Sequence, residues 1–230
     1  MIKMAVFDMA GTTVDENNVV YKTLMLAINQ RGFDFRLDEV LAQGAGKEKL
    51  AAIRSVLASK EIADASLSEQ IFEDFLLLLE DAYKELNVTE QRNTSKIFAA
   101  LKDRGIWVVL NTGYNREIAE GLIGKIGWKE GEHFDCLVTA SDVDKNRPDP
   151  DMIFWAMNKL GIHNADEVVK VGDSAIDIEE GRNAGCRLSV GITTGAHTHG
   201  QLSEANPDFV IDDLAELIPI IDRLAVAQPV

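Results

Sequence analysis

The chain has 230 residues, of which 46 % are hydrophobic and 27 % are charged, and its formal net charge is −15. This length accommodates one large domain or a core with a smaller inserted domain, and the apolar fraction is enough for a buried core. The acidic charge disfavours binding to nucleic acid or to an anionic membrane surface, because both would repel the chain.

Six short apolar runs mark the places where the chain is expected to form buried strands. They cover residues 2–7, 106–110, 136–138, 168–171, 188–192 and 209–211. Helical patterns are found over residues 95–104, 116–126, 150–160, 176–184 and 214–224. This alternation is typical of an α/β fold with a Rossmann-like, doubly wound and mostly parallel sheet that has helices on both faces.

The stretch from residue 16 to residue 91 breaks this rhythm. It has no strand pattern and only helical patterns, over residues 19–31, 37–42, 47–57 and 67–86. We therefore predict an inserted α-helical cap domain over 16–91 and a Rossmann-like core formed by 1–15 and 92–230. Ligands of such sheets bind beyond the carboxyl ends of the strands, so the cap is expected to close over that edge. The last four residues are expected to fray.

The first apolar run reads as a strand rather than as a targeting signal. It lacks the charged lead and the cleavage pattern of a signal peptide, and no apolar run reaches the roughly 18 residues that span a bilayer. Two cysteines, Cys136 and Cys186, are too few for a disulfide framework and are expected to be buried, reduced thiols. These features favour a cytoplasmic protein.

Two of the predicted strands end in polar residues that could handle an anion. Asp8 follows the first strand, and the backbone N–H groups after it could cradle an anion. Thr112 and Gly113 follow the second strand, just before a helix whose N-terminus favours a phosphoryl oxygen. A plain turn explains each segment equally well when it is taken alone.

Two later segments add a cation and a pair of carboxylates. Arg147 lies before the helix that begins near Pro150, where it is either a fixed charge for carboxylate and phosphoryl oxygens or a solvated loop residue. Asp173 and Asp177 are one helical turn apart and share a face, which suits a hard cation such as Mg²⁺. A helix cap would explain Asp173 but not Asp177.

Histidines 197 and 199 alternate in a loop after the fifth core strand. Alternating histidines can bind a metal. We expect instead a loop that borders the pocket.

The four polar segments, in this order and all at strand ends, resemble the four motifs of the haloacid dehalogenase superfamily, and the resemblance covers nearly the whole chain. It implies that Asp8 is the nucleophile that forms an aspartyl-phosphate. It implies that Thr112 binds the transferring group and that Arg147 supplies the cation of the third motif. Asp173 and Asp177 are then expected to organise Mg²⁺.

The remaining contacts expected around the phosphoryl group come from the same segments. The carbonyl of Ala10 is expected as a further Mg²⁺ ligand, beside the carboxylates of Asp8 and Asp173, with Asp177 reached directly or through water. The residues expected to bind the substrate are Ala10, Gly11, Thr12, Gly46, Gly113 and Tyr114.

Two departures from the superfamily pattern narrow the resemblance to its phosphonatase branch. The superfamily has a second Asp two residues after the nucleophile, where this chain has Ala10, and a Lys where it has Arg147. In the phosphonatase branch a cap lysine forms a Schiff base with an aldehyde substrate, so that the leaving group is an enamine and needs no such acid. Lys49, after Gly46, matches that lysine, whereas Ala52 stands where the branch has a histidine.

Lys49 is expected to lose its proton easily. The positive end of a helix disfavours the charged ammonium form of Lys49, and the positive charge of Lys47 does the same. The negative charge of Glu48 favours the ammonium form and opposes both effects. A solvated surface lysine in a charged run is the alternative interpretation.

The expected activity is therefore a Mg²⁺-dependent hydrolysis of a small phosphonate of the phosphonoacetaldehyde type. One alternative is a phosphatase for a small phosphate monoester, such as phosphoglycolate or a sugar phosphate, which would not need Lys49. Another is a weakly active protein that binds a phosphorylated metabolite, although such a binder would not need Asp8. The branch also implies a homodimer through cap helices, with the apolar residues 76–79 contributing, against a monomer as the alternative.

Overall fold

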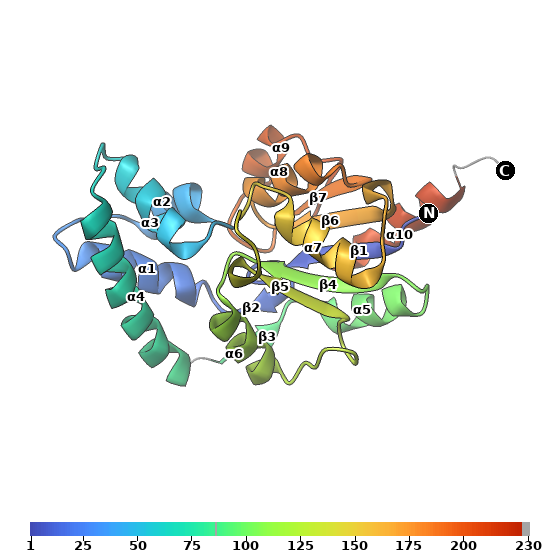
Figure 1. Cartoon of the computed structure of the whole chain (residues 1–230), viewed down its shortest axis with the longest axis horizontal. Helices are drawn as coiled ribbons and strands as arrows, with labels where there is room; N and C mark the ends of the chain where they lie inside the picture. Colours follow the sequence, from blue (N-terminus) through green and yellow to red (C-terminus); the bar gives the residue numbers. More distant parts are fainter. Residues whose placement is uncertain (86, 227–230) are drawn as a thin grey trace.

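A parallel sheet forms the centre of the molecule (Figure 1). The computed structural model describes residues 1–85 and 87–226. The strand order is β5-β4-β1-β6-β7-β8, and every neighbouring pair is parallel. The strands are β1 (Met4–Asp8), β4 (Trp107–Thr112), β5 (Cys136–Thr139), β6 (Val168–Gly172), β7 (Leu188–Ile192) and β8 (Phe209–Ile211). The predicted α/β class and the six core strands are confirmed.

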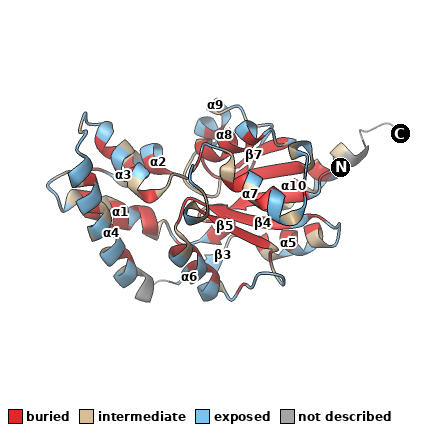
Figure 2. Cartoon of the chain, viewed as in Figure 1, coloured by how far each residue is buried: buried red, intermediate tan, exposed pale blue. Residues whose placement is uncertain are grey.

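Helices cover both faces of this sheet, as Figure 2 shows by the buried strands between partly exposed helices. They are α5 (Thr94–Lys102), α6 (Arg116–Ile126), α7 (Asp151–Leu160), α8 (Ala175–Ala184), α9 (His199–Glu204) and α10 (Leu217–Val226). Successive side chains of a strand point to opposite faces. Met4 and Val6 accordingly pack in one core cluster with α7, whereas Phe7 packs in the other, with its ring 5.3 Å from that of Phe98 in α5.

A group of four helices leaves the sheet after β1 and lies beside the carboxyl ends of the strands (Figure 1). Its members are α1 (Val19–Asn29), α2 (Leu37–Gly44), α3 (Lys49–Ala58) and α4 (Ala65–Glu85). We call them the helical unit. They occupy the stretch predicted as a cap, although the exact domain boundaries stay a prediction.

Two short strands join the helical unit to the core and correct the prediction for residues 16–91. β2 (Val14–Asp15) pairs antiparallel with β3 (Thr89–Glu90), which lies inside the stretch predicted to contain no strand. Both residues of β3 are exposed and polar, so the strand leaves no apolar pattern in the sequence.

Several predicted helix boundaries are shifted by one or two residues, and three differences are larger or have an evident cause. Helix α3 begins at Lys49 instead of residue 47, because the Glu48 side chain accepts hydrogen bonds from the next turn and caps the helix. The stretch 214–224 is divided into a 3₁₀ turn (Leu214–Glu216) and α10. Helix α9 was not predicted. The predicted helix end at Leu86 and the fraying predicted for 227–230 lie outside the described residues.

The described residues also bear on the state of the two cysteines and on membrane-spanning helices. Both Cys136 and Cys186 are free thiols, although Cys186 is only partly buried. In the part of the chain that the structure describes, no helix combines the length and the apolarity that a membrane crossing needs.

Candidate active site

The polar strand ends meet at the centre of one sheet edge. Asp8 ends β1, Thr112 ends the neighbouring β4, and Asp173 follows directly after β6 on the other side of β1. Because these strands are parallel and adjacent, their carboxyl ends fall side by side. The structure thus brings together residues that are up to 165 positions apart in the sequence.

Three carboxylates gather at this edge. Oxygen atoms of Asp8, Asp173 and Asp177 lie within 4.8 Å of one another, and all three residues are buried. Burial raises the pKa of Asp8, although the nearby Arg147 opposes the rise. Burial and repulsion from Asp8 raise the pKa of Asp173 well above its usual value. A buried oxygen cluster of excess negative charge has the ligand chemistry that a hard divalent cation takes, so this cluster could hold a metal ion.

The loops around the cluster hold Asp173 closely. The backbone N–H of Ala196 donates to Asp173 Oδ2 at 2.6 Å, and Thr12 Oγ1 donates to Oδ1 at 3.2 Å. A Cβ atom on Gly11 or Gly195 would lie 2.4 or 1.9 Å from Oδ2, so both positions need glycine. Gly11 also has a φ of 87°, which glycine adopts without strain. These contacts fix the direction of the Asp173 carboxylate.

Arg147 is buried beside Asp8, and its nitrogen atoms lie close to protein oxygens. Its Nη1 lies 2.7 Å from Asp8 Oδ1 and 2.8 Å from Asp177 Oδ1, and its Nε lies 3.0 Å from Glu180 Oε2. Its Nη2 donates to the backbone and the side-chain oxygens of Asn111. All three nitrogen atoms of the guanidinium therefore lie close to protein oxygens, although Nε forms an ion pair with Glu180 and no well-aligned hydrogen bond. The contact of Arg147 with phosphoryl oxygens stays a prediction.

Three buried residues of this edge were missed in the sequence. Lys170 Nζ lies 2.9 Å from Asp177 Oδ1, 3.1 Å from Glu180 Oε2 and 2.6 Å from Asn111 Oδ1. Burial would raise the pKa of Asp177, but Arg147 and Lys170 hold it below its usual value. A signal was present, since a lysine inside an apolar strand needs a buried partner and Glu180 lies three residues after Asp177 on one helix face.

Lys49 lies in the same site although it belongs to the helical unit. Its side chain is buried, and its Nζ donates to the carbonyl of Lys47 and to the Tyr21 hydroxyl at 3.4 Å. The Nζ also lies 5.0 and 4.8 Å from the ring centres of Tyr21 and Tyr114. Burial lowers the pKa of Lys49 to about 8, against the opposing charges of Glu48 and Asp8.

The cause of this pKa shift differs from the one predicted. Burial is the largest cause of the lowered pKa, whereas the sequence predicted that the positive helix end and Lys47 would cause it. Lys47 instead directs its own Nζ to the hydroxyl of Ser55 at 2.9 Å. The alternative of a solvated surface lysine is wrong for Lys49, because only 3 % of the residue is exposed.

One small cavity joins the sheet edge to the helical unit. It has a volume of about 10 Å³, room for about one water molecule. Its walls are formed by Asp8, Ala10, Tyr21, Gly46, Lys49, Thr112, Gly113, Tyr114 and Asp173. Most of the residues predicted for substrate, nucleophile and metal thus surround one space.

Gly11 and Thr12 are exceptions among the residues predicted to bind substrate. Neither is among the residues that line the cavity. The N–H of Gly11 donates to the carbonyl of Val14 at 2.9 Å and that of Thr12 to the carbonyl of Met9 at 3.2 Å, so the turn itself uses both donors. Their place is behind Asp173, whose position they fix.

The helical unit touches the core over this cavity. A Cβ atom on Gly113 would lie 2.6 Å from the carbonyl oxygen of Gly46 and 2.8 Å from that of Lys47, so the two loops meet backbone to backbone. A Cβ atom on Gly46 would lie 2.6 Å from Ser174 Oγ. Within the helical unit, Ala52 is fully buried against Gly44. A Cβ atom on Gly44 would lie 3.2 Å from that of Ala52, so the contact between these two helices depends on small residues.

The comparisons with known proteins agree with this geometry. The model of the family described as haloacid dehalogenase-like hydrolases matches residues 5–190. The chain belongs to this family.

Several known proteins resemble this hydrolase along most of its length. Two phosphonoacetaldehyde hydrolases from Bacillus cereus strains are 31 % and 30 % identical, and each match covers 96 % of this chain and 86 % of the relative. A phosphonoacetaldehyde hydrolase-like protein from Oleispira antarctica, 21 % identical, superimposes with a TM-score of 0.81 over 100 % of this chain and 96 % of that one. A predicted phosphoglycolate phosphatase from Haemophilus somnus, 18 % identical, gives a TM-score of 0.79 over 96 % and 98 % of the two chains.

The histidine loop of this hydrolase does border the site. His197 Nδ1 accepts a hydrogen bond from the N–H of Ala175 at 3.0 Å, at the start of α8, whereas His199 Nδ1 lies 3.3 Å from Ser203 Oγ in α9. The two rings therefore serve different helices. Among the described residues, neither belongs to the metal-type cluster.

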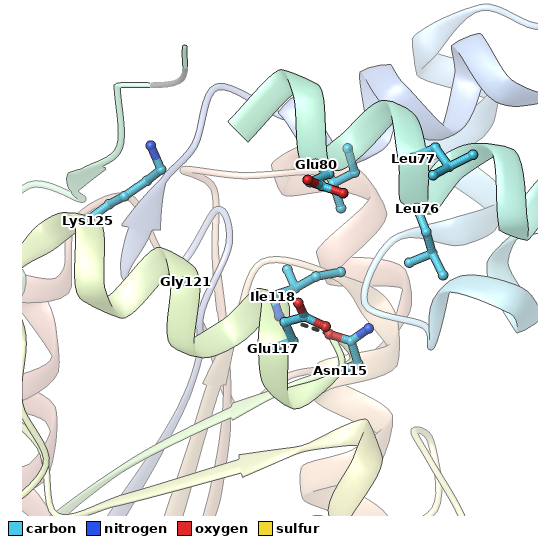
Figure 3. A pocket seen from close by; sticks show the side chains of 9 residues that line it. Leu76, Leu77, Glu80, Asn115, Glu117, Ile118, Gly121 and Lys125 are labelled. Carbon is cyan, nitrogen blue, oxygen red and sulfur yellow. Dashed lines mark hydrogen bonds between the residues drawn. The ribbon is translucent and has the colours of Figure 1, made fainter. Parts of the chain in front are cut away.

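A larger hollow lies beside the site, between α4 and α6 (Figure 3). It has a volume of about 280 Å³ and is lined by Leu76 and Leu77 opposite Ile118. Within the run predicted to form a dimer, Leu77 is 67 % exposed but Leu79 only 2 %. Only part of that run can therefore reach a second copy, and the homodimer stays a prediction.

The buried charge network makes one stability prediction. Glu180→Gln leaves Arg147 and Lys170, each with a side chain 1 % exposed, without one of their carboxylates. We expect the free energy of unfolding to fall by about 3–5 kcal/mol, because breaking a buried ion pair leaves uncompensated charge. Urea unfolding measures it, with the neighbouring exposed Glu179→Gln as control. Equal stability of the two variants would contradict the prediction.

Proposed function

We propose that this hydrolase is a Mg²⁺-dependent, phosphonatase-like enzyme that cleaves the P–C bond of a small phosphonate bearing an aldehyde, of the phosphonoacetaldehyde type. The observation that carries the proposal is that the buried amine of Lys49 shares one cavity with the carboxylate of Asp8. A nucleophile for phosphorus and a nucleophile for a carbonyl carbon thus face the same small space. The names of the curated relatives support this substrate class.

The acidic cluster is the proposed place of the metal. Asp8, Asp173 and the carbonyl of Ala10 would hold Mg²⁺. Asp177 is directed to Arg147 and Lys170 through one oxygen and accepts from Ser174 through the other, so it would reach the cation through water. The cation, when bound, neutralises charge on the phosphoryl group.

The protein groups on the phosphorus side are arranged for attack by Asp8. Arg147 holds Asp8 Oδ1, which leaves Oδ2 to attack phosphorus in line. The role of Arg147 is therefore to position the nucleophile. The Thr112 hydroxyl accepts from the N–H of Tyr114 at 3.2 Å, so its own proton is free to be donated to a phosphoryl oxygen.

On the carbon side, Lys49 makes the leaving group stable. Its neutral amine adds to the aldehyde carbon and water leaves, which gives an imine, and the imine takes up one proton to become an iminium ion. When Asp8 bonds to phosphorus, the P–C bond breaks and its electron pair forms the C=C bond of an enamine. The enamine takes a proton on carbon and is hydrolysed to free the product aldehyde and Lys49. Water then cleaves the aspartyl-phosphate to phosphate and restores Asp8.

Ala10 favours this chemistry over hydrolysis of an ordinary phosphate ester. An alkoxide leaving group needs a proton donor, and such help gives about 10²–10⁴-fold in rate. A methyl group at position 10 cannot supply that proton, whereas an enamine leaving group does not need it.

The decisive experiment compares two substrates in the presence of Mg²⁺. Phosphate release is measured from phosphonoacetaldehyde and from phosphoglycolate, and borohydride is added to reduce any imine to a stable adduct. Release from phosphonoacetaldehyde, with the adduct mapped to Lys49 by mass spectrometry, is the expected result. Release from phosphoglycolate alone, with no adduct, would overturn the proposal and favour a monoester phosphatase. Tight binding of both compounds without any turnover would favour a binding protein.

The pH dependence of trapping provides a separate prediction. Only the neutral amine attacks an aldehyde, and burial lowers the pKa of Lys49 to about 8. The initial rate of adduct formation should therefore rise as the pH increases through about 8 and level off above it. It is measured from about pH 6 to about pH 10, a range that includes the ordinary lysine value of about 10.4. A rate that still rises steeply at the upper limit would show that the amine is not perturbed.

A further inference from the structure

The hydroxyl of Tyr21 connects the helical unit to the reacting groups. Tyr21 lies in α1 and lines the same cavity as Asp8 and Lys49. Its oxygen accepts a hydrogen bond from the N–H of Gly46 at 2.9 Å and lies 3.4 Å from Lys49 Nζ. The ring is buried, with 5 % of the residue exposed. The backbone of Gly46 thus fixes this hydroxyl beside the amine.

The proton of this hydroxyl has no acceptor in the described part of the chain. A phenol oxygen has two lone pairs and one proton. Both lone pairs face N–H donors, of Gly46 and of Lys49, and among the described residues no hydrogen bond is formed in which Tyr21 is the donor. A buried donor without a partner is costly, so its partner is expected to be a ligand in the cavity.

The chemistry proposed for Lys49 needs a proton to move across this gap. When a neutral lysine amine and an aldehyde condense to an imine, two protons pass from nitrogen to the aldehyde oxygen, which leaves as water. Ala10 stands where the wider superfamily has an aspartic acid, and Ala52 stands where the phosphonatase branch has a histidine. Neither side chain can carry a proton.

We propose that Tyr21 is the proton relay between Lys49 and the carbonyl oxygen of the substrate, which deepens the proposed function and rests on it. As the C–N bond forms, the phenol gives its proton to the carbonyl oxygen and takes one from Lys49 Nζ. A second transfer by the same route completes the hydroxyl as water, and the C–O bond breaks as the nitrogen pair forms C=N. Both protons come from the lysine, and the phenol ends unchanged.

Burial supports the relay in one respect. It raises the pKa of Tyr21 well above its usual value, and the charges of Asp173 and Asp8 act in the same direction. The hydroxyl is therefore protonated across the working range and is always able to donate.

Tyr21→Phe tests the relay, because it removes one oxygen and keeps the ring that packs on Lys49. Adduct formation with phosphonoacetaldehyde is followed over time in the presence of borohydride, for the wild type and the variant. We expect the rate of trapping to fall about 100-fold, the lower end of the gain from proton transfer, whereas the final amount of adduct per subunit stays the same. A collapsed site would lower the final amount as well, which distinguishes a relay from a structural role.

Thr23→Val is the matched control, since Thr23 is a buried hydroxyl residue of the same helix that does not line the cavity. It should trap at the wild-type rate. A wild-type protein that forms an adduct, together with a Tyr21→Phe variant that forms it equally fast or in lower final amount, would overturn the relay and leave the proposed function standing. A wild-type protein that forms no adduct would overturn both.

Discussion

Asp8→Asn is expected to lower kcat for phosphate release by at least about 10⁴-fold, a loss of the size seen when a covalent nucleophile is removed from other enzymes. The amide has nearly the same shape, and it can still accept from Arg147 Nη1, which lies 2.7 Å from Asp8 Oδ1. What it lacks is the negative oxygen that attacks phosphorus. Release of inorganic phosphate under saturating substrate measures the effect.

Asp149→Asn is the matched control for this variant. Asp149 is exposed and lies two residues after Arg147, so the same change there removes a charge without touching the cavity. It should retain wild-type kcat. An Asp8→Asn protein that is folded by circular dichroism and still releases phosphate at a tenth of the wild-type rate would exclude Asp8 as the nucleophile.

Lys49→Met should lower turnover of phosphonoacetaldehyde by about 10⁴-fold, which corresponds to about 5.4 kcal/mol in the activation barrier. Methionine fills the apolar space of the lysine stem but cannot form an imine. Without the imine, the P–C bond would have to break to the anionic enolate of the aldehyde, which is a poorer leaving group than a neutral enamine. Phosphate release and borohydride trapping should be lost together.

Lys47→Met controls for the loss of a positive charge in the same loop. The Lys47 ammonium donates to Ser55, and only its backbone carbonyl contacts Lys49 and Gly113, so the substitution keeps those contacts. This variant should trap at the wild-type rate. If Lys47→Met instead lost the adduct while Lys49→Met kept it, the imine would belong to the other lysine.

The positions that sequence predicts well are those at strand ends. Asp8, Thr112 and Asp173 each follow an apolar run. The carboxyl ends of parallel strands all lie at one edge of the sheet, whatever the order of the strands. Lys49 was predicted from a family pattern in a loop, and the structure places it in the same cavity. The four core motifs and the helical insertion could therefore be predicted without knowing how the side chains pack.

Residues that depend on the order of strands or on side-chain packing were harder to predict. Asn111 and Lys170 meet because β4 and β6 lie on either side of β1, which the sequence does not state. Arg147 is surrounded by Asp8, Glu180 and Asn111, and only the packed geometry reveals this. Tyr21 reads as an ordinary apolar position of a helix until the helical unit is placed against the core.

The backbone contact between Gly46 and Gly113 restricts the entry of substrate and the release of products. The space beneath it holds about one water molecule, so neither an aldehyde phosphonate nor its products can pass while the two loops touch. We therefore expect each catalytic cycle to include a movement of the helical unit away from the sheet and back. In the proposed mechanism, the covalent adducts formed while the loops touch are shielded from bulk solvent, so we expect the rate of loop separation to contribute to the lifetime of each intermediate.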